Sequence, residues 1–199
     1  PVAGYIRFGK WNEVLTLPAP EPRYYHASAF HHFARGTAFL RKGRLLEAKK
    51  ELMILDSINR LDTLKSIFTF YNSAQQLSNI ATQLLKGEIL IGQKKLEDGL
   101  RVLQSAVMAE DTLRYNEPPD WRLPVRQYLG AALLDAGRYT EAEKVFQDDL
   151  TKNPENGWSL QGLLQAQQKL GKSKETSATT SRFQKVWKHA DVKINASTF

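Results

Sequence analysis

The sequence predicts an all-helical protein, a right-handed α-α solenoid built from helical hairpins. Two observations indicate this fold class. Glycine and alanine recur at the same intervals in several parts of the 199 residues. Apolar residues between them recur every three or four positions, as they do on one face of a helix. We therefore expect residues 1–199 to form a single array of hairpins.

The clearest hairpin lies at residues 121–154. Gly130, Gly137, Ala142, Phe146 and Pro154 follow one another there at offsets of seven, five, four and eight. Gly130 and Ala142 have little or no side chain, so helices that carry them can approach closely. Gly137 is expected in a left-handed turn, and Pro154 just past the end of the second helix.

The second helix of this hairpin is expected to be capped by Thr140. Glu143 follows three residues later and would complete a capping box. Val145, Phe146 and Leu150 then supply an apolar face for packing.

These intervals, with Leu129 before the first glycine and Leu133 three residues after it, resemble the tetratricopeptide repeat. Arg126 and Leu133 stand where the family signature has tryptophan and tyrosine, so the match is stronger in spacing than in identity. Residues 109–163 and 182–199 are also similar to the C-terminal region of bacterial tetratricopeptide proteins of unassigned role. The resemblance implies a helical scaffold and brings no catalytic motif.

Further copies of the hairpin are expected on both sides of this one. Two upstream copies keep the intervals of seven and five, at Gly36, Gly43 and Ala48 in residues 24–56 and at Gly87, Lys94 and Gly99 in residues 72–110. The second of them begins with a long helix. Residues 157–190 are interpreted as a degenerate capping copy, in which Thr176 and Thr180 replace the expected alanine and phenylalanine.

The remaining segments interrupt or end the array. Residues 1–18 are interpreted as the second half of a truncated repeat, and residues 57–71 as an insertion that holds a loop or a short helix. Residues 111–120 contain a prolyl pair and are expected to form an extended connector. Residues 191–199 form a tail.

The resemblance implies a concave groove, lined by the first helix of each hairpin, in which a peptide or protein segment binds. Carried over position by position, its residues are Phe30, Phe33, Thr37, Leu40, Leu84, Glu88, Ile91, Gln127, Ala131, Leu134, Asp135, Gln161 and Gln165. The lysine and asparagine with which some members hold a free carboxylate are missing from the equivalent places. The mixture suits an apolar or amphipathic peptide. The alternative is that Phe30, Phe33 and Leu84 are buried by the insertion or by neighbouring hairpins.

A second candidate surface is basic, in keeping with the net charge of +7. Basic residues gather at the hairpin turns, where a stacked array would align them along one rim: Arg41, Lys42, Arg44, Lys94, Lys95, Lys169, Lys172 and Lys174. Such a rim would bind nucleic acid or an acidic partner. The simpler interpretation is that cations at helix C-termini are favoured by the helix dipole and stay solvated.

The sequence offers no residues for catalysis or for a cofactor. His26, His31 and His32 lie close together, but their spacing does not put three ligands on one helical face, so no metal site is predicted. Cysteine is absent, and so are the motifs of the zinc proteases, the serine hydrolases and the nucleotide-binding folds. No apolar run is long enough to span a membrane.

We therefore expect a protein-binding scaffold and not an enzyme. Binding of nucleic acid or an acidic partner through the basic rim is the second hypothesis. The third is a regulatory or assembly part of a larger enzyme whose active site lies upstream of Pro1.

Overall fold

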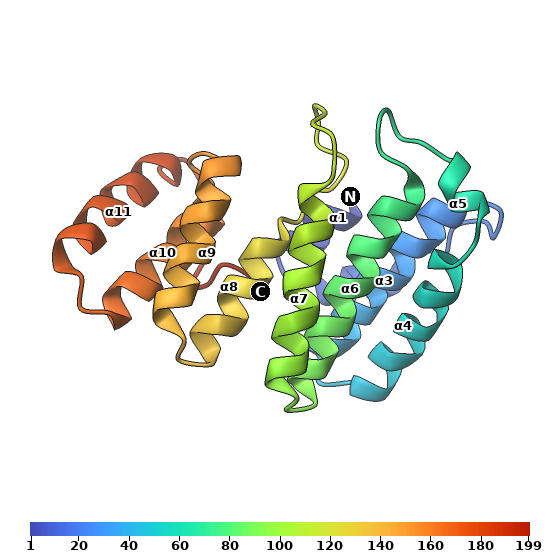
Figure 1. Ribbon diagram of the computed structural model, residues 1–199, viewed down its shortest axis with the longest axis horizontal. Helices are drawn as coiled ribbons and strands as arrows, with labels where there is room; N and C mark the ends of the chain where they lie inside the picture. Colours follow the sequence, from blue (N-terminus) through green and yellow to red (C-terminus); the bar gives the residue numbers. More distant parts are fainter. The chain divides into compact units, whose positions relative to one another are not determined.

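The computed structural model describes residues 1–199 and contains eleven α-helices (Figure 1). The only extended pairing is an isolated bridge between Phe68 and Ser73. The predicted all-helical class is confirmed. None of the helices combines the length and the apolar character needed to cross a bilayer. The chain divides into two compact units, unit 1 (residues 1–123 with Phe199) and unit 2 (residues 124–198).

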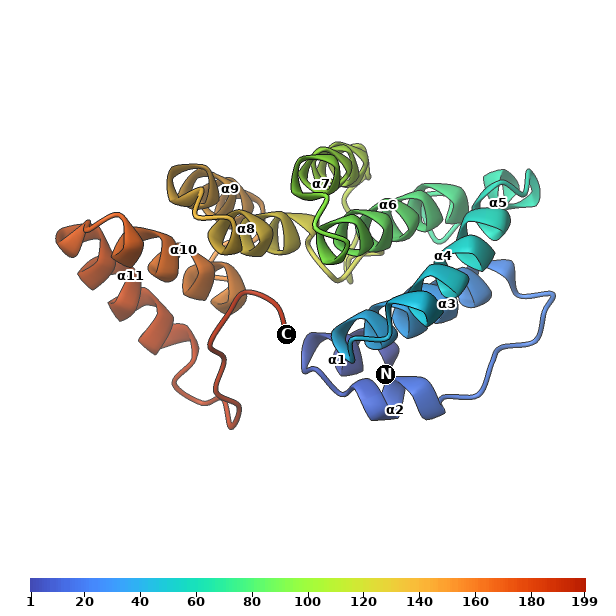
Figure 2. The same cartoon turned by 90° about the horizontal axis from the view of Figure 1, so that it is seen from below.

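Unit 1 is built from two long hairpins and three shorter helices. Its elements are α1 (Val2–Arg7), α2 (Trp11–Thr16), α3 (Tyr25–Arg41), α4 (Leu45–Asn59), α5 (Thr63–Ser66), α6 (Ala74–Gly92) and α7 (Leu96–Asp111). The pairs α3/α4 and α6/α7 are the hairpins. Figure 2 shows α6 between α7 on one side and α3 and α4 on the other.

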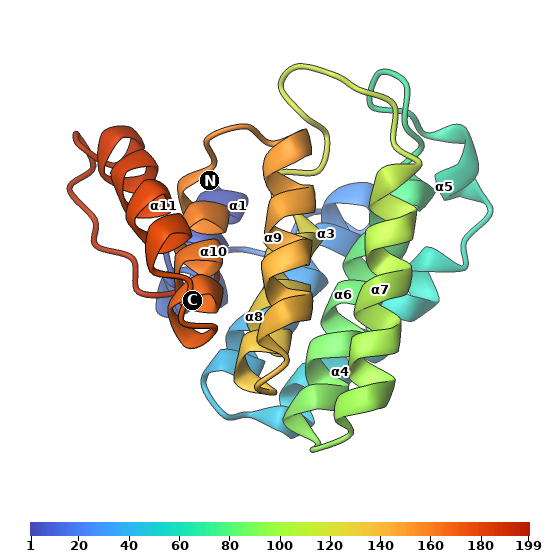
Figure 3. The same cartoon turned by 60° about the vertical axis from the view of Figure 1, so that its left-hand side comes forward.

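Unit 2 contains two hairpins and the C-terminal tail. Its helices are α8 (Val125–Asp135), α9 (Tyr139–Lys152), α10 (Gly157–Lys169) and α11 (Ser173–Val186). The first helix of the second hairpin, α10, packs against both helices of the first hairpin as well as against α11 (Figure 3).

The turns of the hairpins form where the spacing predicts them. Gly43, Gly137 and Gly171 have φ values of 72°, 73° and 70°, in the left-handed region that glycine accepts without steric cost. Lys94 occupies the same place between α6 and α7 with a φ of 63°. In the hairpins α3/α4, α6/α7 and α8/α9, the residue seven positions after the helical glycine is therefore the left-handed residue of the turn.

The buried ring of Phe146 explains the other small residues of unit 2. A Cβ atom at Gly130 of α8 or at Gly162 of α10 would overlap this ring. Phe146 itself, on α9, is fully buried. The two glycines thus leave the space that one aromatic side chain fills between three helices.

In unit 1 the equivalent close contact joins α6 and α7. A Cβ atom at Gly87 would lie 2.8 Å from a methyl carbon of Leu103, and one at Gly99 would lie 2.8 Å from the carbonyl oxygen of Gly87. The sequence pattern has alanine where Gly99 stands. Glycine is required here because the second helix meets the backbone of the first.

The predicted cap at Thr140 is wrong. Helix α9 begins at Tyr139, with Arg138 as its N-cap and no side-chain capping bond. The amide of Arg138 donates to the carbonyl of Leu133, at 2.9 Å, and so closes the preceding helix directly after Gly137. The next helix can then start earlier than the capping box requires. A capping box does form at Ser73 and Gln76, at the start of α6.

Two segments differ in detail from the expectation. Residues 1–18 contain two short helices, α1 and α2, joined at Gly9, where a single helix of a half repeat was expected. Helix α4 continues to Asn59, so it takes in the first residues of the predicted insertion, and α5 is the short helix expected within it. Pro154 follows the end of α9 at Lys152, as predicted.

Candidate functional site

A pocket of about 300 Å³ lies against the first helices of the two long hairpins of unit 1. Its lining comes from α3, α6, the connector before Pro124, and the start of the chain. The residues are His26, Ala29 and Phe30 of α3, Leu77, Ser78 and Ala81 of α6, Asp120, Trp121 and Arg122 of the connector, and Pro1, Val2 and Ala3. This volume is at the lower end of the range for small-molecule sites and is large enough for one or two side chains of a peptide.

An aromatic cluster forms one wall of the pocket. Trp121 meets Phe30 edge to face, with ring centres 6.1 Å apart, and lies 5.6 Å from the ring of Phe33. The indole N–H of Trp121 donates to the carbonyl of Leu123 at 2.7 Å. The ring is therefore fixed in place, and it offers only its apolar surface to an occupant of the pocket.

Two buried polar atoms of the pocket lack a hydrogen-bond partner. They are Nδ1 of His26 and Oγ of Ser78. Ser78 is 2% exposed. Burial lowers the pKa of His26, against the opposing effect of Asp120, so the ring is neutral at pH 7. An unpaired buried donor or acceptor costs about 1–3 kcal/mol, which a ligand that completes the bond would recover.

Asp120 is held at the edge of the pocket by a polar network. Nδ2 of the buried Asn72 donates to Asp120 at 2.8 Å and to the carbonyl of Arg114 at 2.9 Å. Burial alone would raise the pKa of Asp120, but hydrogen bonds from Asn72, Thr69 and Asn116 outweigh it and lower the pKa. Asp120 is therefore a fixed anion at pH 7. The same network joins the loop before α6 to the connector after α7.

Serine, histidine and aspartate thus line one pocket, but they do not form a catalytic relay. Ser78 Oγ and His26 Nδ1 have no hydrogen-bond partner, and the carboxylate of Asp120 is held by Asn72 and Asn116. Activation of a serine requires a base within hydrogen-bond reach of its hydroxyl. In this arrangement the side chains of Ser78, His26 and Asp120 can bind and orient a ligand.

Several residues predicted to line the groove of unit 1 are buried. Phe33, Thr37 and Leu84 are 0%, 1% and 0% exposed, so they contact neighbouring helices and cannot reach a ligand. The physical reason is that α6 packs against both α3 and α4, which covers this face. Phe30 alone of the predicted set lines the pocket. The remaining members, Leu40, Glu88 and Ile91, are half-buried.

In unit 2 the predicted groove residue Gln127 is also buried. Its side-chain amide donates to Asn156 at 3.0 Å and to Ser159 at 2.9 Å. Ser159 in turn donates to Asp149, whose pKa is raised by burial. Gln127 therefore ties α8 to the start of α10. Of the other predicted residues, Ala131, Leu134, Gln161 and Gln165 are half-buried and Asp135 is exposed.

The basic residues at the hairpin turns do not share one environment. Three of the predicted rim form ion pairs, Arg41 with Glu88, Arg44 with Glu47 and Lys172 with Glu143. Lys42 donates to the amide oxygen of Asn12 at 2.8 Å. Lys94, Lys95, Lys169 and Lys174 are exposed. Carboxylates thus offset part of the positive charge on which the rim hypothesis depends.

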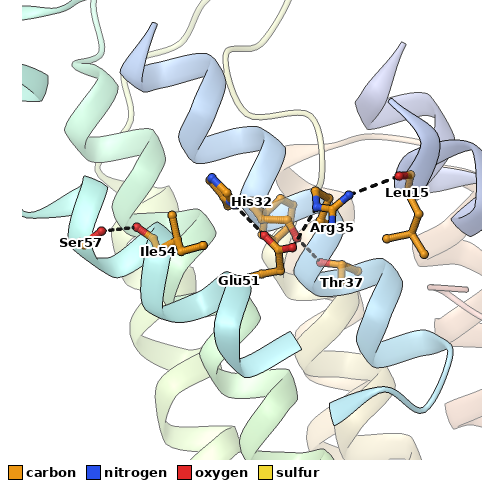
Figure 4. Close-up of polar contacts among 8 residues, drawn as sticks. Leu15, His32, Arg35, Thr37, Glu51, Ile54 and Ser57 are labelled. Atoms are coloured by element: carbon orange, nitrogen blue, oxygen red, sulfur yellow. Dashed lines mark hydrogen bonds and ion pairs between the residues drawn. The ribbon is translucent and has the colours of Figure 1, made fainter. Parts of the chain in front are cut away.

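His32 belongs to a charged cluster between α2, α3 and α4 (Figure 4). Glu51 of α4 accepts from Nδ1 of His32 at 2.6 Å and from Nε of Arg35 at 2.9 Å. Arg35 also donates to the carbonyl of Leu15 at 3.3 Å. No group of three or more possible ligands is close enough together to hold a metal ion. The cluster links three helices.

Sequence reasoning missed most of the pocket. Neither Asn72, Ser78, Asp120 nor Trp121 was a candidate, because the repeat pattern concerns positions within a hairpin and these residues meet only after the chain folds. The available signal was the dipeptide Asp120–Trp121 after a prolyl pair, since a large aromatic residue in a connector is often anchored. Comparison with protein-family models, with curated proteins and with solved structures found no match.

Proposed function

We propose that this chain is a tetratricopeptide-like solenoid that binds a peptide or protein segment on the first helices of its hairpins. The repeated turn residues and the glycines around Phe146 support the repeat assignment. Stacked arrays of such hairpins create extended surfaces that are used for binding.

The observation that carries the proposal is the pocket between α3 and α6. Both are first helices, and each contributes three residues to its lining. Trp121, Phe30 and Leu77 offer apolar contact, and the unpartnered atoms of His26 and Ser78 offer hydrogen bonds. An aromatic or branched apolar side chain that carries a hydrogen-bonding group, or that lies beside a peptide bond, matches this arrangement.

The pocket can be tested with peptides selected from a random library on the immobilised full chain. Affinities are then compared between the wild type and Ala81→Leu, which fills the pocket from α6. Ala27→Leu is the matched control, because it adds the same atoms at an exposed position of α3. Circular dichroism establishes that both variants are folded.

We expect the selected peptides to share an apolar anchor and to bind Ala81→Leu at least about tenfold more weakly, a loss of about 1.4 kcal/mol. Ala27→Leu should bind as the wild type does. Equal affinity for all three proteins would show that the pocket does not bind the peptides. A library from which no binder emerges would count against the function itself.

A further inference from the structure

The C-terminal tail of unit 2 folds back onto the helices that precede it. After α11, the indole N–H of Trp187 donates to the carbonyl of Val192 at 2.6 Å. Figure 2 shows the chain then turning back from the end of α11 toward α10 and α8. The chain forms neither helix nor strand over this stretch.

Two hydrogen bonds hold the tail to the first helices of unit 2. The side-chain amide of Gln165, on α10, donates to the backbone carbonyl of Asn195 at 2.7 Å. The hydroxyl of Ser197 donates to the backbone carbonyl of Gln127, on α8, at 3.0 Å. Ser197 is 1% exposed. The bond from Gln165 is made to the backbone of the tail, so it does not depend on the side chain of Asn195. The bond to Gln127 requires a small hydroxyl side chain at position 197.

Two side chains of the tail are buried. Ile194 is 6% exposed and Ser197, three positions later, is 1% exposed. Lys193 and Asn195, on either side of Ile194, are exposed to solvent. The tail is therefore held by one apolar side chain and one hydroxyl, with solvent-exposed residues beside them.

We propose that α8 and α10 form a binding site for a non-helical peptide, and that residues 192–198 occupy it as an internal ligand. This tail site consists of the Gln127 carbonyl, Gln165 and the surface that covers Ile194. We expect it to bind a peptide that has an apolar residue at the position of Ile194. The backbone carbonyl of the next residue accepts from Gln165, and serine follows two positions after that residue. The inference rests on the proposed function and assigns the ligand chemistry for unit 2.

A tail that already occupies the tail site regulates the site by competing with other peptides. A segment tethered to its own site is present at a local concentration that reaches the millimolar range for a short linker. A free peptide of the same kind must compete with it, so the site is closed until the tail is displaced or a tighter partner arrives.

The first experiment uses the full chain with Ile194→Asp, which places a charge where the tail is buried and so detaches it. The probe is the synthetic peptide DVKINAST, residues 191–198, with blocked ends. We expect this peptide to bind the detached variant at least about tenfold more tightly than the wild type, because the competing tail is gone. A peptide with Asp at the place of Ile194 should bind neither protein, and adding Gln165→Ala to the detached variant should weaken binding.

The second experiment does not require a detached tail. The chain has no cysteine, so Ile194→Cys introduces the only thiol. We expect its alkylation to be slow in the folded protein and to be accelerated by an excess of DVKINAST or by Gln165→Ala, at denaturant concentrations where circular dichroism still reports a folded chain. Gln161→Ala, on the same helix, is the control for Gln165→Ala.

Two results would overturn the inference. One is a folded Ile194→Asp variant that binds DVKINAST no better than the wild type does. The other is an Ile194→Cys variant whose thiol becomes reactive only when the whole chain unfolds, since the tail would then be part of the core. Neither result bears on the pocket of α3 and α6, and loss of peptide binding in Ala81→Leu leaves the tail site unaffected. The two proposals can therefore fail separately.

Discussion

At Gly130 and Gly162 the backbone of two helices touches the same aromatic ring. In an ordinary helix, alanine is about 1 kcal/mol more favourable than glycine, so glycine at either place needs a reason. That reason is Phe146, whose buried ring occupies the space a Cβ atom would take on both sides.

We predict that Gly130→Ala and Gly162→Ala each lower the free energy of unfolding by about 1–3 kcal/mol, because an overfilled core must move the ring. Urea titration followed by circular dichroism measures the change. Gly4→Ala is the control, since nothing lies within 4 Å of a Cβ atom there, and it should be neutral or slightly stabilising. Stabilisation by Gly130→Ala would mean that α8 and α9 do not approach closely.

Glu51 is the acceptor at the centre of the charged cluster in unit 1. Its side chain is 10% exposed and bonds both His32 and Arg35. Burial alone would raise its pKa, but the hydrogen bonds from these two residues outweigh burial, and the pKa is lowered from 4.5. The folded state therefore binds a proton at Glu51 less readily than the unfolded chain does.

It follows that Glu51 stabilises the fold above pH 4.5 and that this contribution is lost as the pH falls through its lowered folded value. We predict that Glu51→Gln costs about 1–3 kcal/mol at pH 7 and that its difference from the wild type shrinks toward zero in acid. Denaturant titrations at several pH values test this. Glu47→Gln, at an exposed ion pair on the same helix, should have a smaller effect. A difference that is constant with pH would exclude an ionised Glu51 as the cause.

At the scale of the hairpin, the residue after the first helix decides how sharply the chain reverses. Gly43, Gly137 and Gly171 adopt the left-handed conformation at this place, whereas the α6/α7 turn has Lys94 with a φ of 63°. A residue with a Cβ atom is strained there by about 1–2 kcal/mol relative to glycine.

We predict that Lys94→Gly raises the free energy of unfolding by about 0.5–1 kcal/mol, the strain removed being partly offset by the greater freedom of glycine in the unfolded chain. Thermal unfolding of the full chain measures the shift. The converse change, Gly137→Ala, should destabilise, and Lys95→Gly, next to the turn but at the N-cap of α7, should give no comparable gain. A destabilised Lys94→Gly variant would show that the side chain, and not the backbone, determines this turn.

The helices and their turns could be predicted because each hairpin is specified by residues close together in the chain. Gly36, Gly43 and Ala48, for example, define one hairpin within 13 residues. The open surface could not be predicted in this way. Phe33 and Leu84 are buried because α3, α4 and α6 meet, and Gln127 because α8 meets the start of α10. Such contacts join residues far apart in sequence, which a repeat pattern does not describe.

The pocket and the tail site were missed for the same reason. Asp120 enters the pocket through a hydrogen bond with Asn72, 48 residues earlier, and Ser197 reaches Gln127, 70 residues earlier. Of the predicted groove, Phe30 lines the pocket and Gln165 binds the tail. Both are on first helices, the location that the repeat resemblance implied.

For the molecule as a whole, the net charge of +7 makes weak attraction to polyanions unavoidable. Such attraction is sequence-independent and falls steeply with salt, because it comes from the release of counterions. A specific basic surface would bind a polyanion more tightly, because several of its cations would contact the same ligand. Arg41, Arg44 and Lys172 already pair with carboxylates of this chain. Such a surface would therefore depend on the exposed lysines of the turns.

We predict that these lysines are not a specific nucleic-acid site. Replacing Lys94, Lys95, Lys169 and Lys174 by glutamine should weaken the binding of a single-stranded oligonucleotide no more than replacing four exposed lysines on helix faces or near a helix end, Lys50, Lys86, Lys185 and Lys188. Both sets remove the same charge, so fluorescence anisotropy over a range of salt concentrations should give the same reduction in slope for each. A larger loss of affinity for the turn set, persisting at physiological salt, would establish the rim as a binding surface and would favour an acidic partner over an apolar peptide.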